Sequence, residues 1–303
     1  MGVRKVDTLR SVASKDRGAE TGARGVRIPR VNKRRLVLWG IGIASVACVA
    51  AAVSRLGVES SAEAAPVTGP NANAVSVLVE LFTSEGCSSC PPADGVLASL
   101  ERTQSVAGAR IVPLALHVDY WDGIGWPDPF SSAQATQRQR SYSPLGSGSY
   151  TPQAVVDGRA EMIGSRKSLV EQAIADAAKR AHATLGIEVA PRKTPAAPAE
   201  VTVKIGALPA GSAADAELLV ALTQNAAKVA VPRGENAGKT LEHTAITRQL
   251  VVVGPAPPGG ASLSTSLTLP QGLAPKELRV VAFVQERSTR KVLGTATRDL
   301  EAP

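Results

Sequence analysis

The sequence predicts an α/β domain over residues 74–183 and an all-β, sandwich-like domain over residues 184–303, preceded by a membrane helix or an export signal. Three observations support this fold class. An uncharged apolar run lies near the N-terminus. Strand-like and helix-like segments then alternate up to residue 182. After residue 184 helical periodicity disappears, and short β-branched segments recur between turn residues.

A basic leader occupies residues 1–35, with eleven Lys and Arg against three acidic residues, so it carries the whole formal net charge of +8. It has no apolar periodicity, and we expect a disordered cytoplasmic segment. The rest of the chain is formally neutral and shows no basic patch. Nucleic acid is therefore not an expected partner.

The apolar run covers residues 36–53 (LVLWGIGIASVACVAAAV). Eighteen residues at ~1.5 Å each approach the ~30 Å of a bilayer's hydrocarbon core. Basic residues precede it and only Arg55 follows closely, which places the N-terminus in the cytoplasm. A cleaved signal is the alternative, because the run is short and small residues follow it. Both interpretations predict a periplasmic or otherwise extracytoplasmic protein. It is held at the inner membrane through this run or secreted, with residues 54–73 as a flexible spacer.

The α/β domain begins with a Val- and Leu-rich segment that is typical of a buried strand. Asp157-Gly158 is the strongest hairpin signal and separates two short strands. We expect strands at residues 75–83, 111–118, 153–156 and 160–163, and helices at 87–104, 131–142 and 165–182. This β-α-β-α-β-β-α order is that of the thioredoxin fold, so the domain is predicted to be thioredoxin-like. Its CxxC pair lies at the turn from the first strand into the first helix.

The second domain is predicted from alternating segments separated by turns such as Pro255–Gly260. Its expected strands cover residues 187–189, 201–205, 218–222, 247–253, 263–269, 278–284 and 292–297.

The pair Cys87 and Cys90 carries the expected chemistry. A cysteine at a helix N-terminus is stabilised as thiolate, so Cys87 is the candidate nucleophile and Cys90 the thiol that resolves a mixed disulfide. An oxidising compartment suits such a disulfide. Zinc would need further ligands in a suitable pattern, so no metal site or cofactor is predicted. Two alternatives stay open: an inert structural disulfide, and a copper carrier that uses both cysteines with His117.

Glu80 lies inside the first apolar strand, seven residues before Cys87. Burial of a carboxylate is costly and raises its pKa. Thioredoxins carry an acid at nearly this place. We therefore expect Glu80 beneath Cys90, among Val79, Leu81 and the first helix, as the proton acceptor for Cys90.

Four residues are candidates for binding the substrate. Thioredoxin-like proteins carry a cis proline opposite the CxxC, and Thr151-Pro152 precedes the hairpin at that position. Tyr120 and Trp121 follow the second strand, whose C-terminal end is where ligands bind in open α/β sheets. We interpret them as a substrate-facing wall, with packing of this loop onto the core as the alternative. His243 is interpreted as an ordinary residue of the β domain.

Six motifs occur together in this sequence: FTSEGCSSCPPAD (82–94), HVDYWD (117–122), GWPDPF (125–130), RQR (138–140), YTPQAVVDG (150–158) and RGEN (233–236). With their joint spacing they resemble a bacterial family of exported, thioredoxin-like proteins, the domain of unknown function 1223. The resemblance covers about residues 75–300 and implies export and redox chemistry, with protein thiols or disulfides of the cell envelope as partners. It implies no particular substrate, and the Ser-Ser between the cysteines leaves the direction of electron flow open.

Overall fold

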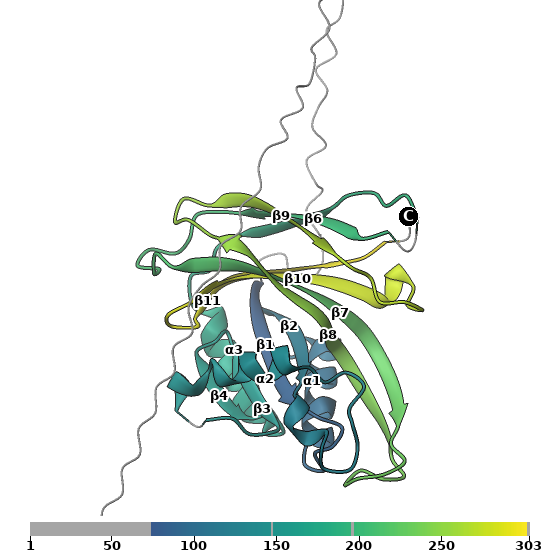
Figure 1. Ribbon diagram of the computed structural model, residues 1–303. Helices are drawn as coiled ribbons and strands as arrows, with labels where there is room; N and C mark the ends of the chain where they lie inside the picture. The colour runs from purple at the N-terminus through teal and green to yellow at the C-terminus, as the bar shows by residue number, and fades with distance from the viewer. Residues whose placement is uncertain (1–73, 147, 195–196, 302–303) are drawn as a thin grey trace, which may run out of the picture. The chain divides into compact units, whose positions relative to one another are not determined.

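The computed structural model describes residues 74–146, 148–194 and 197–301 (Figure 1). The predicted leader, apolar run and spacer lie outside these residues. Within them, no helix combines the length and the apolar character needed to cross a membrane.

The first part of the described chain alternates strands with helices, and the rest is almost entirely strands. In chain order the first part contains β1 (Val75–Thr83), α1 (Pro91–Thr103), β2 (Ala109–His117), α2 (Ala133–Arg140), β3 (Gln153–Val156), β4 (Ala160–Ile163) and α3 (Lys167–Ala178). The second contains β5 (Leu185–Val189), β6 (Ala199–Ile205), β7 (Ala216–Ala230), β8 (Thr240–Pro255), β9 (Ala261–Leu267), β10 (Leu278–Glu286) and β11 (Val292–Asp299).

One mixed sheet of eight strands joins the two parts, in the order β11-β10-β7-β8-β2-β1-β3-β4. The strands β5, β6 and β9 form a second sheet. Within the large sheet β1 runs parallel to β2 and antiparallel to β3. The junction between the two parts is narrow, a parallel bridge from Ala115 of β2 to Ile246 of β8.

The predicted fold class, a thioredoxin-like α/β domain followed by a sandwich-like domain, is therefore wrong. The described chain is mostly β, has only three α-helices, and builds its main sheet from both predicted halves. The reason lies in β7 and β8, which run for 15 and 16 residues and extend far beyond the short apolar segments that predicted them. Alternation in the sequence identifies a strand, but it does not identify the strand with which it pairs.

The hydrophobic cores explain why this sheet is continuous. Val77, Val79 and Leu81 of β1 face a core that α1 and α3 complete. Leu78 and Phe82 face the other side, where apolar residues of β7, β10 and β11 share their core. Since β1 is buried on both faces, it is apolar at nearly every position, as the sequence indicated. A third core lies between the sheet of β5, β6 and β9 and one face of β7 and β10.

Glu80 is the charged residue in this otherwise largely apolar strand, and the position predicted for it is wrong. It is fully buried, but it faces away from α1 and pairs with Arg138 of α2. Nη2 of Arg138 donates to Oε2 of Glu80 at 3.0 Å, Nε donates to Oε1, and the hydroxyl of Tyr142 also donates to Oε2. Gln285 of β10 accepts from Nη1 of Arg138 at 3.2 Å. This network ties β1 to α2 and β10, so the structure gives Glu80 a structural place and does not set it beneath Cys90.

Arg138→Met tests this network. The substitution should lower the free energy of unfolding by about 3–5 kcal/mol, because it leaves the carboxylate of Glu80 buried without its partner. Adding Glu80→Gln should recover part of that loss. Urea unfolding measures both. Arg140→Met, on the exposed side of the same helix, is the control and should change stability by less than ~0.5 kcal/mol. A loss for Arg138→Met no larger than that of the control would contradict the assignment.

Candidate functional site

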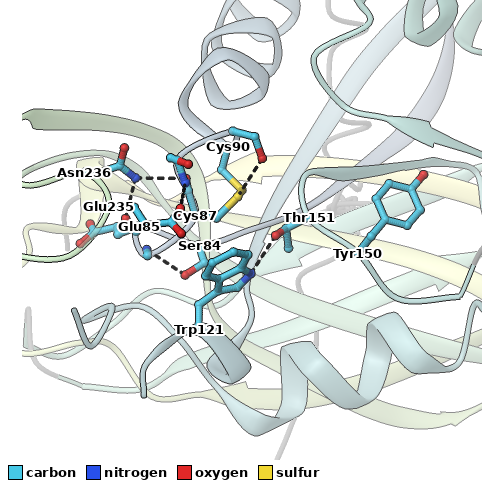
Figure 2. The surroundings of a disulfide bond; sticks show 12 residues. Ser84, Glu85, Cys87, Cys90, Trp121, Tyr150, Thr151, Glu235 and Asn236 are labelled. Carbon is cyan, nitrogen blue, oxygen red and sulfur yellow. Dashed lines mark hydrogen bonds between the residues drawn. A yellow bond between two sulfur atoms is a disulfide. The ribbon is translucent and has the colours of Figure 1, made fainter. Parts of the chain in front are cut away.

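The candidate site is the disulfide Cys87–Cys90, in the turn between β1 and α1 (Figure 2). The backbone N–H of Cys90 donates to the carbonyl of Cys87 at 3.2 Å, and α1 begins at Pro91 with Cys90 as its N-cap. Pro91 and Pro92 suit this start because a first-turn residue needs no N–H for the helix. The helix therefore begins four residues later than predicted, and Cys90 rather than Cys87 occupies its N-terminus.

Both sulfurs are shielded in the oxidised form. The exposed fraction is 1% for Cys87 and 0% for Cys90. The intervening Ser88 and Ser89 are exposed, and Oγ of Ser89 lies 3.3 Å from Sγ of Cys87. A reacting partner would approach the pair from this serine side.

The β7–β8 connection contacts the disulfide turn through Glu235 and Asn236, as Figure 2 shows. Nδ2 of the buried Asn236 donates to the carbonyls of Glu85 at 2.8 Å and of Cys87 at 3.0 Å. The exposed carboxylate of Glu235 accepts from the backbone N–H of Ser88 at 3.0 Å, and hydrogen bonds from the side chain and the backbone of Ser88 lower the pKa of Glu235. The motif RGEN supplies these residues, but the sequence alone carried no signal that they contact the cysteines.

The predicted substrate residues lie on the next loops. Nε1 of Trp121 donates to Oγ1 of Thr151 at 2.8 Å, and Cβ of Trp121 would lie only 3.1 Å from a Cβ built on Gly86. The tryptophan therefore packs directly against the residue that precedes Cys87. The Thr151–Pro152 peptide bond is cis, as predicted. Tyr120 is 38% exposed and donates to Gln139 at 3.1 Å, so its phenol is held toward α2.

Behind the disulfide, beneath the first turn of α1, lies a group of buried polar side chains that sequence reasoning missed. We call it the acid–imidazole cluster. None of its members is more than 7% exposed, and each comes from a different element or loop. The members are Thr83, Glu85, Asp94, His117, Asp128 and His243.

Carboxylates hold both imidazoles of this cluster. Oδ2 of Asp128 lies 2.6 Å from Nδ1 of His117, and Oε1 of Glu85 lies 3.0 Å from Nε2 of His243. The two rings stack edge to face with centroids 4.9 Å apart. Trp126 also donates to Glu85 at 2.6 Å. His243 is thus part of the site and not an ordinary residue of a separate domain.

Asp94 is the member of the cluster on α1. Burial raises the pKa of its carboxyl group to about 7, against an opposing attraction from His243. The negative charges of Asp128 and Glu85 act in the same direction as burial. Asp94 therefore changes its protonation state near neutral pH, unlike an ordinary aspartate.

His117, the residue considered for copper, is held by Asp128 as described above. Across the residues that the structure describes, no group of three or more His, Cys, Asp or Glu side chains is arranged to hold a metal ion.

A shielded disulfide beside a helix N-terminus, with a hairpin loop closing over it, defines a protein with a candidate thiol–disulfide site. Residues 78–285 match the profile of a family described as protein of unknown function (DUF1223), and the chain belongs to that family. The search of curated proteins gave no significant match.

Two solved structures share the fold. A structural-genomics crystal structure of an Agrobacterium tumefaciens protein is 27% identical with a TM-score of 0.56, covering 76% of this chain and 99% of that one. HBP35 of Porphyromonas gingivalis is 17% identical with a TM-score of 0.58, covering 76% of each chain. A domain of the outer membrane lipoprotein Omp28 of the same organism reaches only 0.27 at 14% identity, over 40% of this chain and 90% of that one.

Asp94→Asn tests the burial of this carboxyl group through the pH dependence of stability. The unfolded aspartate ionises near pH 3.8, whereas the folded Asp94 keeps its proton to about pH 7. Below pH ~4 the buried carboxyl group therefore leaves the free energy of unfolding unchanged. Between pH ~4 and pH ~7 it lowers the free energy of unfolding of the wild type progressively, by up to the order of 4 kcal/mol. Relative to the wild type, Asp94→Asn should gain stability as the pH rises from 4 to 8, measured by urea unfolding at each pH.

Asp176→Asn is the control for that experiment. Asp176 is exposed on α3, and its hydrogen bond with Lys179 lowers its pKa, so the difference from wild type should be small and of opposite sign. A constant difference between wild type and Asp94→Asn across the pH range would show that Asp94 titrates normally.

Proposed function

We propose that this protein is a thiol–disulfide oxidoreductase of the cell envelope, with Cys87–Cys90 as its reversible disulfide. The observation that carries this proposal is the position of the disulfide. It occupies a turn at the N-terminus of α1, and two exposed serines separate its cysteines. A purely structural disulfide gains most by closing a long loop, whereas this one spans a sequence separation of three residues.

The surroundings suit thiolate chemistry. The N-terminus of a helix carries a partial positive charge that stabilises a thiolate and lowers its pKa. The Ser89 hydroxyl, 3.3 Å from Sγ of Cys87, can donate to a thiolate formed there. Cys90 is the residue at the helix N-terminus, whereas the Ser89 hydroxyl contacts Cys87, and on this contact Cys87 remains our candidate for the sulfur that exchanges with the substrate, with Cys90 as the resolving sulfur.

The exchange needs no group beyond the partner's thiols. A substrate thiolate attacks Sγ of Cys87, the Cys87–Cys90 bond breaks, and Cys90 leaves as a thiolate. A second substrate thiolate then attacks the substrate sulfur of the mixed disulfide and releases Cys87 reduced. The substrate is oxidised to a disulfide and the protein is reduced, and the reverse sequence reduces a substrate disulfide. Trp121, which packs on Gly86 and donates to Thr151, is our candidate for contact with a protein substrate, together with Thr151 and Pro152.

Exchange by the full-length chain with Cys48→Ser tests this function, because that substitution leaves only the pair. Equilibration with glutathione buffers should reduce and reoxidise the pair reversibly. Cys90→Ser should trap a mixed disulfide at Cys87 with a peptide disulfide, and Cys87→Ser should trap at least tenfold less. Mass spectrometry measures both.

Three outcomes would overturn the proposal. A pair that stays oxidised across the whole range of glutathione buffers would be a structural disulfide. Equal trapping by the two variants would contradict the roles of the cysteines. Copper retained stoichiometrically by the reduced protein, without exchange activity, would favour the carrier.

The location of this chemistry rests on the N-terminal sequence. We propose that residues 36–53 export or anchor the chain, so that residues 74–303 lie outside the cytoplasm. A C-terminal alkaline phosphatase fusion, which is active only after export, should be active in cells. Deleting residues 36–53 should abolish that activity while the fusion is still expressed. An inactive full-length fusion, with activity from a reporter that works only in the cytoplasm, would contradict export.

A further inference from the structure

Any exchange at Cys90 requires the transfer of a proton, and the acid–imidazole cluster contains groups that can take part in this transfer. When the disulfide opens, Cys90 gains the electron pair of the broken bond, and when it closes again Cys90 must lose its proton. Cys90 is 0% exposed, and a buried thiolate is costly. A proton donor and acceptor inside the protein would therefore speed both directions of the reaction.

Asp94 is placed for this role by the geometry of α1. Cys90 has helical backbone angles (φ −79°, ψ −40°), and the N–H of Asp94 donates to its carbonyl at 3.1 Å. Residues four apart on a helix lie on one face, with Cβ atoms roughly 5–6 Å apart. Both residues are buried, whereas Pro92 and Gly95 on the other side of this turn are exposed. The Asp94 carboxyl group and the Cys90 sulfur thus share the face that packs on the sheet.

Glu80, the other buried acid near this end of β1, is not available for the step. It faces the opposite side of the sheet and is held by Arg138. Of the remaining acids in the cluster, Glu85 is bonded to His243 and Trp126, and Asp128 to His117.

We propose that Asp94 is the proton donor and acceptor of Cys90, and that the rest of the acid–imidazole cluster positions and tunes it. This inference rests on the thiol–disulfide function proposed above. In the resolving step the Cys90 thiol gives its proton to the Asp94 carboxylate. Its sulfur then attacks Sγ of Cys87, and the Cys87–substrate bond breaks to release a substrate thiolate. In the opposite direction the protonated Asp94 returns the proton to Cys90 as the disulfide opens.

The charge environment of Asp94 supports both directions. Burial raises its pKa to about 7, so near neutral pH the acid and its carboxylate are both populated. The groups that face it are Thr83 and Glu85 at the end of β1, Asp128 from the following loop, and His243 from β8. The two acids raise the pKa of Asp94 and the imidazole lowers it. Because these groups come from separate parts of the chain, they can adjust the pKa of Asp94 without contacting the disulfide.

The decisive experiment is the pH profile of the resolving step in the full-length chain with Cys48→Ser. A mixed disulfide of Cys87 with a chromophoric thiol is formed, and the chromophore released by Cys90 is followed by stopped flow. The wild-type rate should rise with pH through an inflection near 7. Asp94→Asn should remove that inflection and slow resolution at pH 7 by about tenfold to hundredfold, the range expected for loss of a general base. Asp94→Glu should restore the inflection at least in part.

Two matched controls separate a chemical from a structural role. Glu101→Gln makes the same change on the same helix, and Glu80→Gln makes it on the other face of β1. Both should keep the wild-type pH profile. Infrared difference spectra between the oxidised and reduced protein give a readout that is independent of rate. The band of a protonated carboxyl group should change on reduction in the wild type and be missing in Asp94→Asn.

The outcomes distinguish this inference from the proposed function. If the wild type resolves the mixed disulfide and Asp94→Asn keeps its profile and infrared band, the Asp94 assignment is wrong and the oxidoreductase function stands. If the wild type forms no mixed disulfide and exchanges no thiols, the proposed function itself fails.

Discussion

The long β7–β8 hairpin determines how the candidate site is assembled. Its strands pair along nearly their whole length, and β8 lies beside β2 through the bridge from Ala115 to Ile246. This placement brings the hairpin loop over the disulfide turn, where Asn236 holds the carbonyls of Glu85 and Cys87. It also places His243 beneath α1, against Glu85. Without the hairpin, the turn would lose its cover and the acid–imidazole cluster would lose one of its two imidazoles.

Two buried acids on opposite faces of the sheet illustrate how the same residue type takes different roles. Glu80 is neutralised by a bidentate pair with Arg138 and by the hydroxyl of Tyr142, so its charge is compensated in place. Asp94 has no such cation, and burial moves its pKa into the neutral range. A buried carboxylate that is paired with a cation ties structural elements together. A buried carboxyl group that has only polar neighbours can still exchange its proton.

The sequence predicted well those structural features that depend on residues close together in the chain. The first strand has the predicted bounds 75–83, the two short strands flank Asp157-Gly158 as expected, and Thr151–Pro152 is cis. Turn chemistry and apolar runs are local signals, and local structure follows them. The sheet partner of β8, the face on which Glu80 lies and the place of His243 depend on contacts between residues far apart in the chain. Helix periodicity likewise did not distinguish Asp94 from an ordinary first-turn acid, because negative residues are favourable at any helix N-terminus.

The hydrogen bonds inside the cluster determine which imidazole nitrogens can accept. A carboxylate only accepts, so Nδ1 of His117 donates to Asp128 and Nε2 of His243 donates to Glu85. In a neutral imidazole the second nitrogen is then an acceptor. Within the described residues, Nε2 of His117 and Nδ1 of His243 are buried without a hydrogen-bond partner.

An ionised Asp94 would add only acceptors to this space, whereas its protonated form adds a donor. Burial is the largest effect on the pKa of Asp94 and raises it, while the attraction of His243 and a hydrogen bond with Thr83 lower it in part. Passing the proton to Cys90 leaves Asp94 ionised, and its return restores the donor when the disulfide closes again. The burial that raises the energy of the carboxylate therefore increases its tendency to take the proton from the Cys90 thiol.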